Sequence, residues 1–186
     1  VCAATCAMST AVALDAIAQV AKPARIAVLA FGTPASHGYL VDAFRVALRD
    51  LGYVEGRDVV YELRWAEGYA DRLPALAEEL ARSRPDVFVT ATAAATRAAM
   101  IASPSAAILM AYGSDPVGNR LVASLARPGG RVTGMSNLAE GLVGKMFELL
   151  RTLVPSAQRL TLLVNPTNLT AAVYRTDAED AARALR

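Results

Sequence analysis

The sequence predicts an α/β fold built on a doubly wound parallel sheet. Five short apolar runs recur along the chain, separated by polar turns and by segments with helical periodicity. Such alternation is typical of βαβ units. Right-handed crossovers leave few strand orders, and we expect 2-1-3-4-5 with the second strand at the edge. The expected strands are residues 25–31, 59–65, 87–90, 107–111 and 131–134.

The bulk composition agrees with a globular chain. It has 186 residues, of which 54% are hydrophobic and 19% charged, enough for one domain or for one domain plus part of another. The formal charge of +2 comes from 19 basic and 17 acidic residues that are interspersed. Because no basic stripe forms, nucleic acid is not an expected partner. No apolar run reaches the length of a membrane-spanning helix.

The first half of the chain supplies two strands and two helices. Residues 25–31 form an apolar run typical of a buried parallel strand, and residues 32–38 are its expected loop. A helix follows and stops at Gly52. Residues 59–65 alternate in polarity, as a half-exposed edge strand does. Asp71 is the expected cap of the next helix, whose apolar stripe is Leu73, Leu76, Ala77 and Leu80.

The second half is organised around residues 113–137. A polar turn follows the strand at 107–111, and a short amphipathic helix is expected before the break at residues 127–130. The strand at 131–134 then leads into residues 133–137, the expected crossover between two lobes. Earlier, residues 92–102 form a helix of small residues after the third strand.

Beyond Asn137 the pattern restarts. We expect a helix at 138–153, a buried strand at 160–164 and another helix at 169–186. One βα unit with its preceding helix cannot close a sheet. The sequence therefore predicts an N-terminal lobe at residues 22–134 and an incomplete C-terminal lobe at 135–186.

Residues 1–21 are rich in alanine and carry one acidic residue, Asp15, before Lys22. They resemble the apolar and cleavage regions of a secretory signal whose basic start is missing, and Ala16 and Ala18 fit the small-x-small rule. Both cysteines, Cys2 and Cys6, would leave with it, which fits an oxidising compartment. The alternative is an ordinary N-terminal helix.

Catalytic and metal-binding motifs are missing from the sequence. No Gly-rich phosphate loop and no G-x-S-x-G elbow occurs. His37 is the only histidine, which excludes a two-histidine metal site. A Ser36–His37 pair lacks an orienting acid, and adjacent residues rarely face each other. We expect no enzyme activity, no cofactor and no metal.

The expected site lies at the carboxyl ends of the strands, where doubly wound sheets bind ligands. Thr92, Ala93 and Ala94 begin a helix there, and unpaired backbone N–H groups at a helix N-terminus suit a carboxylate. An ordinary N-cap is the alternative for Thr92. Asp115 can pair with a ligand ammonium or cap the turn that follows it.

The remaining candidates are polar side chains on neighbouring loops. Ser36 and His37 follow the first strand and can equally be solvated surface. Asn137 and Asn165 can hydrogen-bond a ligand from the crossover and from the second lobe. Turn formation is the alternative for both.

Several phrases resemble one family, the tryptophan/tyrosine-type periplasmic substrate-binding proteins of ABC transporters. They are FRVALRDLGYVEG at 44–56, DPVG at 115–118 and, most specifically, LVASLARPGGRVTG at 121–134. The resemblance implies two α/β lobes of the leucine-binding-protein type that clamp a small ligand. It also implies permease subunits as partners, a periplasmic location and a cleft lined by the loops of Ser36, Thr92–Ala94, Asp115, Asn137 and Asn165.

Two departures from that family pattern matter. Members usually show Gly-Thr-Pro near the position of Thr92, Ala93 and Ala94, so a different ligand is expected. Relatives also continue for most of another lobe, so the chain resembles a truncated product, and a non-functional fragment stays an alternative. Two further alternatives are a regulatory effector module of the same fold and a nucleotide-using α/β enzyme. No helix-turn-helix precedes Arg25, which argues against the effector module.

Overall fold

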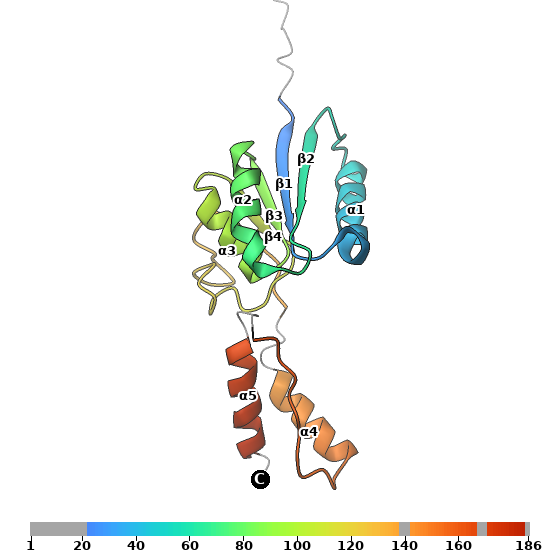
Figure 1. Cartoon of the computed structure of the whole chain (residues 1–186), viewed down its shortest axis with the longest axis vertical. Helices are drawn as coiled ribbons and strands as arrows, with labels where there is room; N and C mark the ends of the chain where they lie inside the picture. The colour runs from blue at the N-terminus through green and yellow to red at the C-terminus, as the bar shows by residue number, and fades with distance from the viewer. Residues whose placement is uncertain (1–21, 138–141, 167–170, 185–186) are drawn as a thin grey trace, which may run out of the picture.

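Five parallel strands form the centre of the structure (Figure 1). The computed structural model describes residues 22–137, 142–166 and 171–184, and the predicted signal segment lies outside them. The strands are β1 (Ala24–Ala30), β2 (Val59–Trp65), β3 (Val87–Thr90), β4 (Ala107–Met110) and β5 (Val132–Gly134). The helices are α1 (Pro34–Asp50), the short 3-10 helix η1 (Ala70–Arg72), α2 (Leu73–Arg82), α3 (Ala93–Ala102), α4 (Val143–Leu153) and α5 (Ala171–Ala184).

The predicted strand order is confirmed. The sheet runs β2-β1-β3-β4-β5, with every neighbouring pair parallel and β2 at one edge. In the register, Ile26 lies opposite Tyr61 on one side and Val87 on the other. All five strands are parallel, so their carboxyl ends lie at the same end of the sheet, which we call the carboxyl edge. In Figure 1 this end faces α4 and α5.

Helices cover both faces of the sheet. Figure 1 shows α2 and α3 on one face and α1 on the other. Successive strand residues point to opposite faces, so each face has its own core. The core under α2 and α3 contains the fully buried Leu29, Phe88 and Ile108. The core under α1 joins Val28 and Val89 to Phe44 and other partly buried side chains.

Helix α1 begins earlier than the sequence predicts. Thr33 is its N-cap, and its side chain accepts a hydrogen bond from the backbone N–H of Ser36. The Ser36 hydroxyl in turn accepts from the Thr33 N–H at 3.0 Å, which completes a capping box. Pro34 occupies the first turn, where a missing N–H costs nothing. The prediction of a loop at residues 32–38 is therefore wrong for residues 34–38, which belong to α1.

The start of α2 also differs from the prediction. Asp71 lies inside η1, and Arg72 is the N-cap of α2 without a side-chain hydrogen bond. The expected Asp71 cap is wrong because η1 continues directly into α2. Instead, Arg64 of β2 fixes the helix by donating twice to one oxygen of Glu79, at 2.9 and 2.7 Å. This hydrogen bond from Arg64 lowers the pKa of Glu79.

The helix predicted between the fourth and fifth strands is absent among the described residues. Residues 116–123 form turns and bends instead. Asp115 and Arg120 both have positive φ, which a continuous helix does not allow. Asn119 donates through Nδ2 to the carbonyls of Ser114 and Asp115, at 3.3 and 2.9 Å. Leu121 is nevertheless buried and packs against Met110 of β4. The amphipathic spacing therefore belongs to a turn that packs on the sheet.

Beyond the sheet, α4 and α5 pack against each other. The buried strand predicted at residues 160–164 is wrong: this segment forms no strand, and Leu163 is 96% exposed. A strand needs a neighbour to pair its backbone groups, and no second sheet lies beside it in the described residues. Residues 138–141, part of the predicted helix, lie outside the described residues.

Arg131 is expected to hold α3 against β4. Its guanidinium donates to the carbonyls of Met100 and Ala106, at 2.5 and 3.0 Å, and also to that of Ser103. These carbonyls lie at and beyond the carboxyl end of α3, where helical acceptors lack partners. Arg131→Ala should lower the free energy of unfolding by about 2 kcal/mol, the scale of hydrogen bonds from a charged donor. Urea denaturation measures it.

Arg97→Ala is the matched control for Arg131→Ala. Arg97 donates to a single carbonyl, that of Asn119, at 2.6 Å in an exposed position. We expect a loss below about 0.5 kcal/mol there, as for surface substitutions in general. Equal losses in the two variants would contradict a special role for Arg131.

Candidate ligand-binding site

A cavity of about 250 Å³ lies at the carboxyl edge of the sheet. Residues that follow four strands line it: Phe31 after β1, Thr92 after β3, Tyr112 after β4 and Asn137 after β5. Asn165 and Tyr174 line it from the part of the chain beyond the sheet. Two other hollows lie beside α4 and α5; one is lined by both apolar and charged side chains, and the other is mostly apolar and shares Asn165 and Tyr174 with this cavity.

The N-terminus of α3 forms one wall of the cavity. Thr92 has an extended backbone and caps the helix, because its hydroxyl accepts from the Ala95 N–H at 3.1 Å. The N–H groups of Ala93 and Ala94 come first in the helix and so have no acceptor within it. Methyl side chains at these two positions let a ligand approach the backbone. The arrangement suits a carboxylate.

Two buried threonines support this wall from below. The hydroxyls of Thr90 and Thr96 lie 2.8 Å apart, and Thr96 also donates to the carbonyl of Thr92 at 2.9 Å. Both threonines are at most 1% exposed. The pair therefore fixes the end of β3 relative to the first turn of α3, where the cavity begins.

Thr96→Val is expected to destabilise the protein. Valine keeps the shape of threonine but removes the hydroxyl, which leaves Thr90 without this partner in a fully buried position. Leaving one buried partner unsatisfied costs about 1–3 kcal/mol in the free energy of unfolding. Thermal and urea denaturation measure the change.

Thr176→Val is the control for that loss. Thr176 makes the same kind of bond, from its hydroxyl to the carbonyl of Ala172 at 3.1 Å, but on the exposed surface of α5. Water replaces the lost partner there, so the change should stay within about 0.5 kcal/mol. A Thr96→Val protein as stable as the control would show that the buried pair is not needed.

Asn137 is fixed at the opposite wall. Its backbone N–H donates to the carbonyl of Gly113 at 2.9 Å, and its Nδ2 donates to the Tyr112 hydroxyl at 2.9 Å. Its Oδ1 is buried and has no hydrogen-bond partner among the described residues. Asn165 lines the same cavity.

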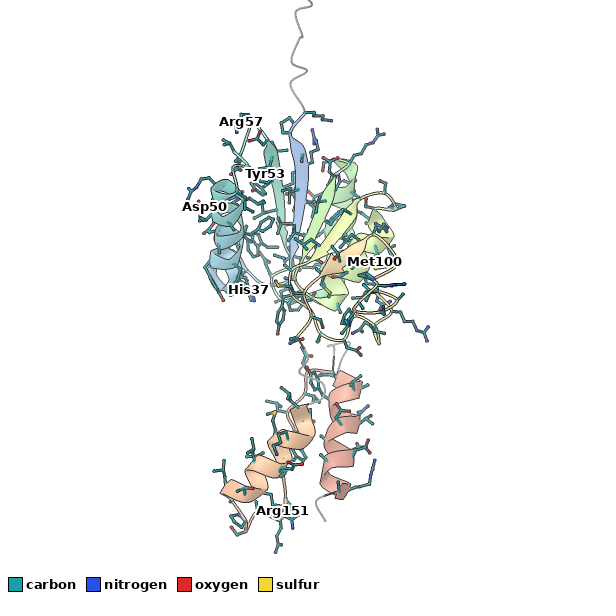
Figure 2. All side chains as sticks on the ribbon, turned by 180° about the vertical axis from the view of Figure 1, so that it is seen from behind. His37, Asp50, Tyr53, Arg57, Met100 and Arg151 are labelled. Atoms are coloured by element: carbon teal, nitrogen blue, oxygen red, sulfur yellow. The ribbon has the colours of Figure 1, made fainter. Side chains whose placement is uncertain are left out.

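Three predicted site residues do not line this cavity. Asp115 caps its own turn, because its Oδ1 accepts from the Gly118 N–H at 2.8 Å. Ser36 belongs to the cap of α1. Its hydroxyl lies 2.7 Å from Nδ1 of His37, so the expectation that these neighbours do not face each other is wrong. Figure 2 shows His37 at the end of the sheet nearer α4 and α5.

The structure therefore brings together five predicted residues, namely Thr92, Ala93, Ala94, Asn137 and Asn165. The aromatic residues of the wall were not predicted. Phe31 and Tyr112 end apolar runs at strand ends, a signal that the sequence contains. Tyr174 lies within a helical segment, and nothing local marks it as a lining residue.

Metal ligands do not gather anywhere in the described part of the chain: no three His, Cys, Asp or Glu side chains are placed to share an ion. Among the helices of that part, none is long and apolar enough to cross a membrane.

A parallel sheet with a cavity at the carboxyl ends of its strands is typical of ligand-binding α/β lobes. Its likeness to solved structures gives the chain the fold of a periplasmic-binding-protein lobe. The family model described as "ABC transporter substrate binding protein" matches residues 25–179. The chain belongs to this family, as its sequence signature predicts.

Individual relatives support the same assignment. A tyrosine-binding protein of Clostridioides difficile is 27% identical over 140 residues, which are 75% of this chain and 40% of that protein. A conserved domain protein from Vibrio cholerae superposes with a TM-score of 0.77 at 25% identity, covering 88% of this chain and 55% of that one. An ABC domain from Streptococcus pneumonia in complex with L-Trp gives 0.76 at 23% identity with the same coverage. The chain thus spans about half the length of these relatives, or less.

Proposed function

We propose that this chain acts in an ABC importer as the solute-binding component and holds an amino acid or a similar small molecule in the cavity at the sheet edge. The observation that carries the proposal is the cavity itself. It combines the N-terminus of α3, amide side chains and aromatic rings at the carboxyl ends of parallel strands.

The walls have complementary chemistry for such a ligand. The first N–H groups of α3, at Ala93 and Ala94, suit its carboxylate. The rings of Phe31, Tyr112 and Tyr174 offer apolar surface for its side chain. An aromatic side chain is favoured because one relative is a tyrosine-binding protein and one structural neighbour contains L-Trp.

The wider context follows from the family. Residues 22–134 would form one lobe and residues 135–186 would belong to the second, with the ligand clamped between them. Permease subunits are the proposed protein partners, and the periplasm is the proposed location. The family is one of solute-binding proteins, which supports binding without catalysis.

A thermal-shift titration tests this function. L-tyrosine and L-tryptophan, added separately to the purified chain, should raise the melting temperature in proportion to the logarithm of ligand concentration once saturation is passed. L-lysine serves as the control, because the described lining residues include no carboxylate to pair with its side-chain ammonium. A cooperative melt that no amino acid shifts at millimolar concentration would contradict the proposal.

A further inference from the structure

We propose that the Tyr112 hydroxyl is a positioning group that orients the amide of Asn137, and that Asn137 Oδ1 then accepts an N–H from the ligand. The ligand class is thereby narrowed to compounds that carry both a carboxylate and an N–H donor. This inference rests on the proposed function and concerns the same cavity.

The backbone of Asn137 is held firmly at the cavity edge. It forms an isolated parallel bridge with Ser114, and its N–H donates to the carbonyl of Gly113. Gly113 is itself buried under Met110, whose sulfur lies 2.5 Å from the position that a Cβ on Gly113 would take. The Asn137 side chain therefore starts from a fixed point.

The amide then has one bonded and one unbonded end. Nδ2 donates to the Tyr112 hydroxyl at 2.9 Å, whereas Oδ1 is buried in the cavity wall and lacks a partner among the described residues. Buried polar atoms almost always find a partner, so an orphan acceptor in a cavity wall requires explanation. A ligand donor supplies the missing hydrogen.

The charge of the wall makes that acceptor important. Among the described lining residues there is no carboxylate, and Asp115 uses its Oδ1 to cap its own turn. An ammonium or amide N–H in the cavity thus has to be recognised by neutral oxygens, and Asn137 Oδ1 is a buried oxygen of the wall that lacks a partner among the described residues. The N-terminus of α3 offers donors on the other side, which suit an anion.

These two walls discriminate between ligand classes. A solute-binding protein of Rhodopseudomonas palustris BisB5 with the same fold is in complex with 3,4-dihydroxy benzoic acid, an aromatic acid without nitrogen. Such an acid could bind α3 through its carboxylate, but it offers Asn137 Oδ1 only hydroxyl donors and no ammonium. Sites built to hydrogen-bond a group reject analogues that lack it. Amino acids satisfy both walls.

The test compares two pairs of probes by isothermal titration calorimetry. L-tyrosine is paired with 3-(4-hydroxyphenyl)propanoate, and L-tryptophan with indole-3-propanoate, so that each pair differs only in the ammonium group. The wild-type chain should bind the amino acid of at least one pair more tightly by about tenfold or more, the scale of a hydrogen bond to a charged group. Tyr112→Phe should reduce this preference about fivefold or more and leave the affinity for the propanoate unchanged.

Two further variants complete the design. Tyr39→Phe removes a hydroxyl from an exposed tyrosine of α1 outside the cavity wall and should change neither affinity. Asn137→Asp replaces the amide by a group that only accepts, and it should keep or increase the preference for the amino acid. An Asn137→Asp protein that prefers the propanoate would overturn the assignment of Oδ1 as the acceptor.

The remaining outcomes separate this inference from the proposed function. Equal affinities for the amino acid and its propanoate in every pair that binds would overturn the inference while leaving a working binding site. A Tyr112→Phe protein that loses both affinities equally would show that Tyr112 is only a contact surface, which also overturns it. Failure of the wild type to bind any of the four probes would overturn the inference and, with it, the aromatic ligand favoured under the proposed function.

Discussion

Gly134→Ala is expected to lower the free energy of unfolding by about 4 kcal/mol, at the upper end of single-substitution effects. Gly134 is the last residue of β5 and has φ of +148°, a conformation that residues with a side chain rarely adopt. A Cβ at this position would lie 1.9 Å from the carbonyl oxygen of Met110. That atom belongs to the backbone of β4, so no side-chain rotation can relieve the clash.

Gly130→Ala is the matched control for Gly134→Ala. Gly130 lies four residues earlier, before the start of β5, and a Cβ there meets no atom within 4 Å. Its replacement should change the free energy of unfolding by less than about 1 kcal/mol. Urea denaturation of the two variants gives the comparison, and a Gly134→Ala protein as stable as Gly130→Ala would refute the close approach.

The same close approach determines where the site begins. Met135 donates its N–H to the Met110 carbonyl at 2.9 Å, and two residues later Asn137 pairs with Gly113. The chain therefore leaves the sheet along the end of β4, which brings Asn137 next to Tyr112. Loss of Gly134 should accordingly weaken ligand binding as well as stability.

Most of the sheet could be predicted because its signals are local. A parallel strand buried on both faces is a short continuous apolar run, and five such runs with helical segments between them leave few topologies. Thr92 could be recognised as a helix start because N-cap chemistry depends on a few neighbouring residues. Each of these features is determined by neighbouring residues in the sequence and does not depend on contacts with distant ones.

The errors have a common physical origin in contacts that spacing does not encode. Residues 116–123 have amphipathic spacing, but side-chain hydrogen bonds from Asn119 and positive φ at Asp115 and Arg120 make turns instead. The apolar run at 160–164 reads as a strand, yet without partner strands in the described residues it forms none. Ser36 was predicted in a loop but lies in the first turn of α1, because the capping box with Thr33 starts the helix earlier.

The loops that form the cavity could be predicted from the sequence, but only some of the side chains that line it could. Asn137 and Thr92 were identified because they are polar residues at strand ends, whereas Tyr112 became meaningful only through its bond to Asn137, 25 residues away. Asp115 had two interpretations in the sequence, and the bond to Gly118 matches the capping one.

Ala94→Phe is expected to reduce the affinity for the bound amino acid by about a hundredfold or more, equivalent to about 2.8 kcal/mol. Ala94 lies in the first turn of α3, is only partly buried and lines the cavity. A phenyl ring there would take up much of a space of about 250 Å³ and cover the N–H groups proposed to bind the carboxylate. Calorimetry with L-tyrosine or L-tryptophan, whichever stabilises the wild type, measures the loss.

Ala94→Ser separates blockage from damage to the helix. Serine changes the same position by one oxygen, so its affinity should stay within about fivefold of the wild type, and both variants should melt cooperatively without ligand. The decisive comparison is between bound and unbound melting temperatures, because a blocked but folded lobe loses only the ligand-induced shift. Unchanged affinity in Ala94→Phe would place the ligand elsewhere, with the hollow between α4 and α5 as the next site to test, since Phe147 and Leu162 line it and Ala94 does not.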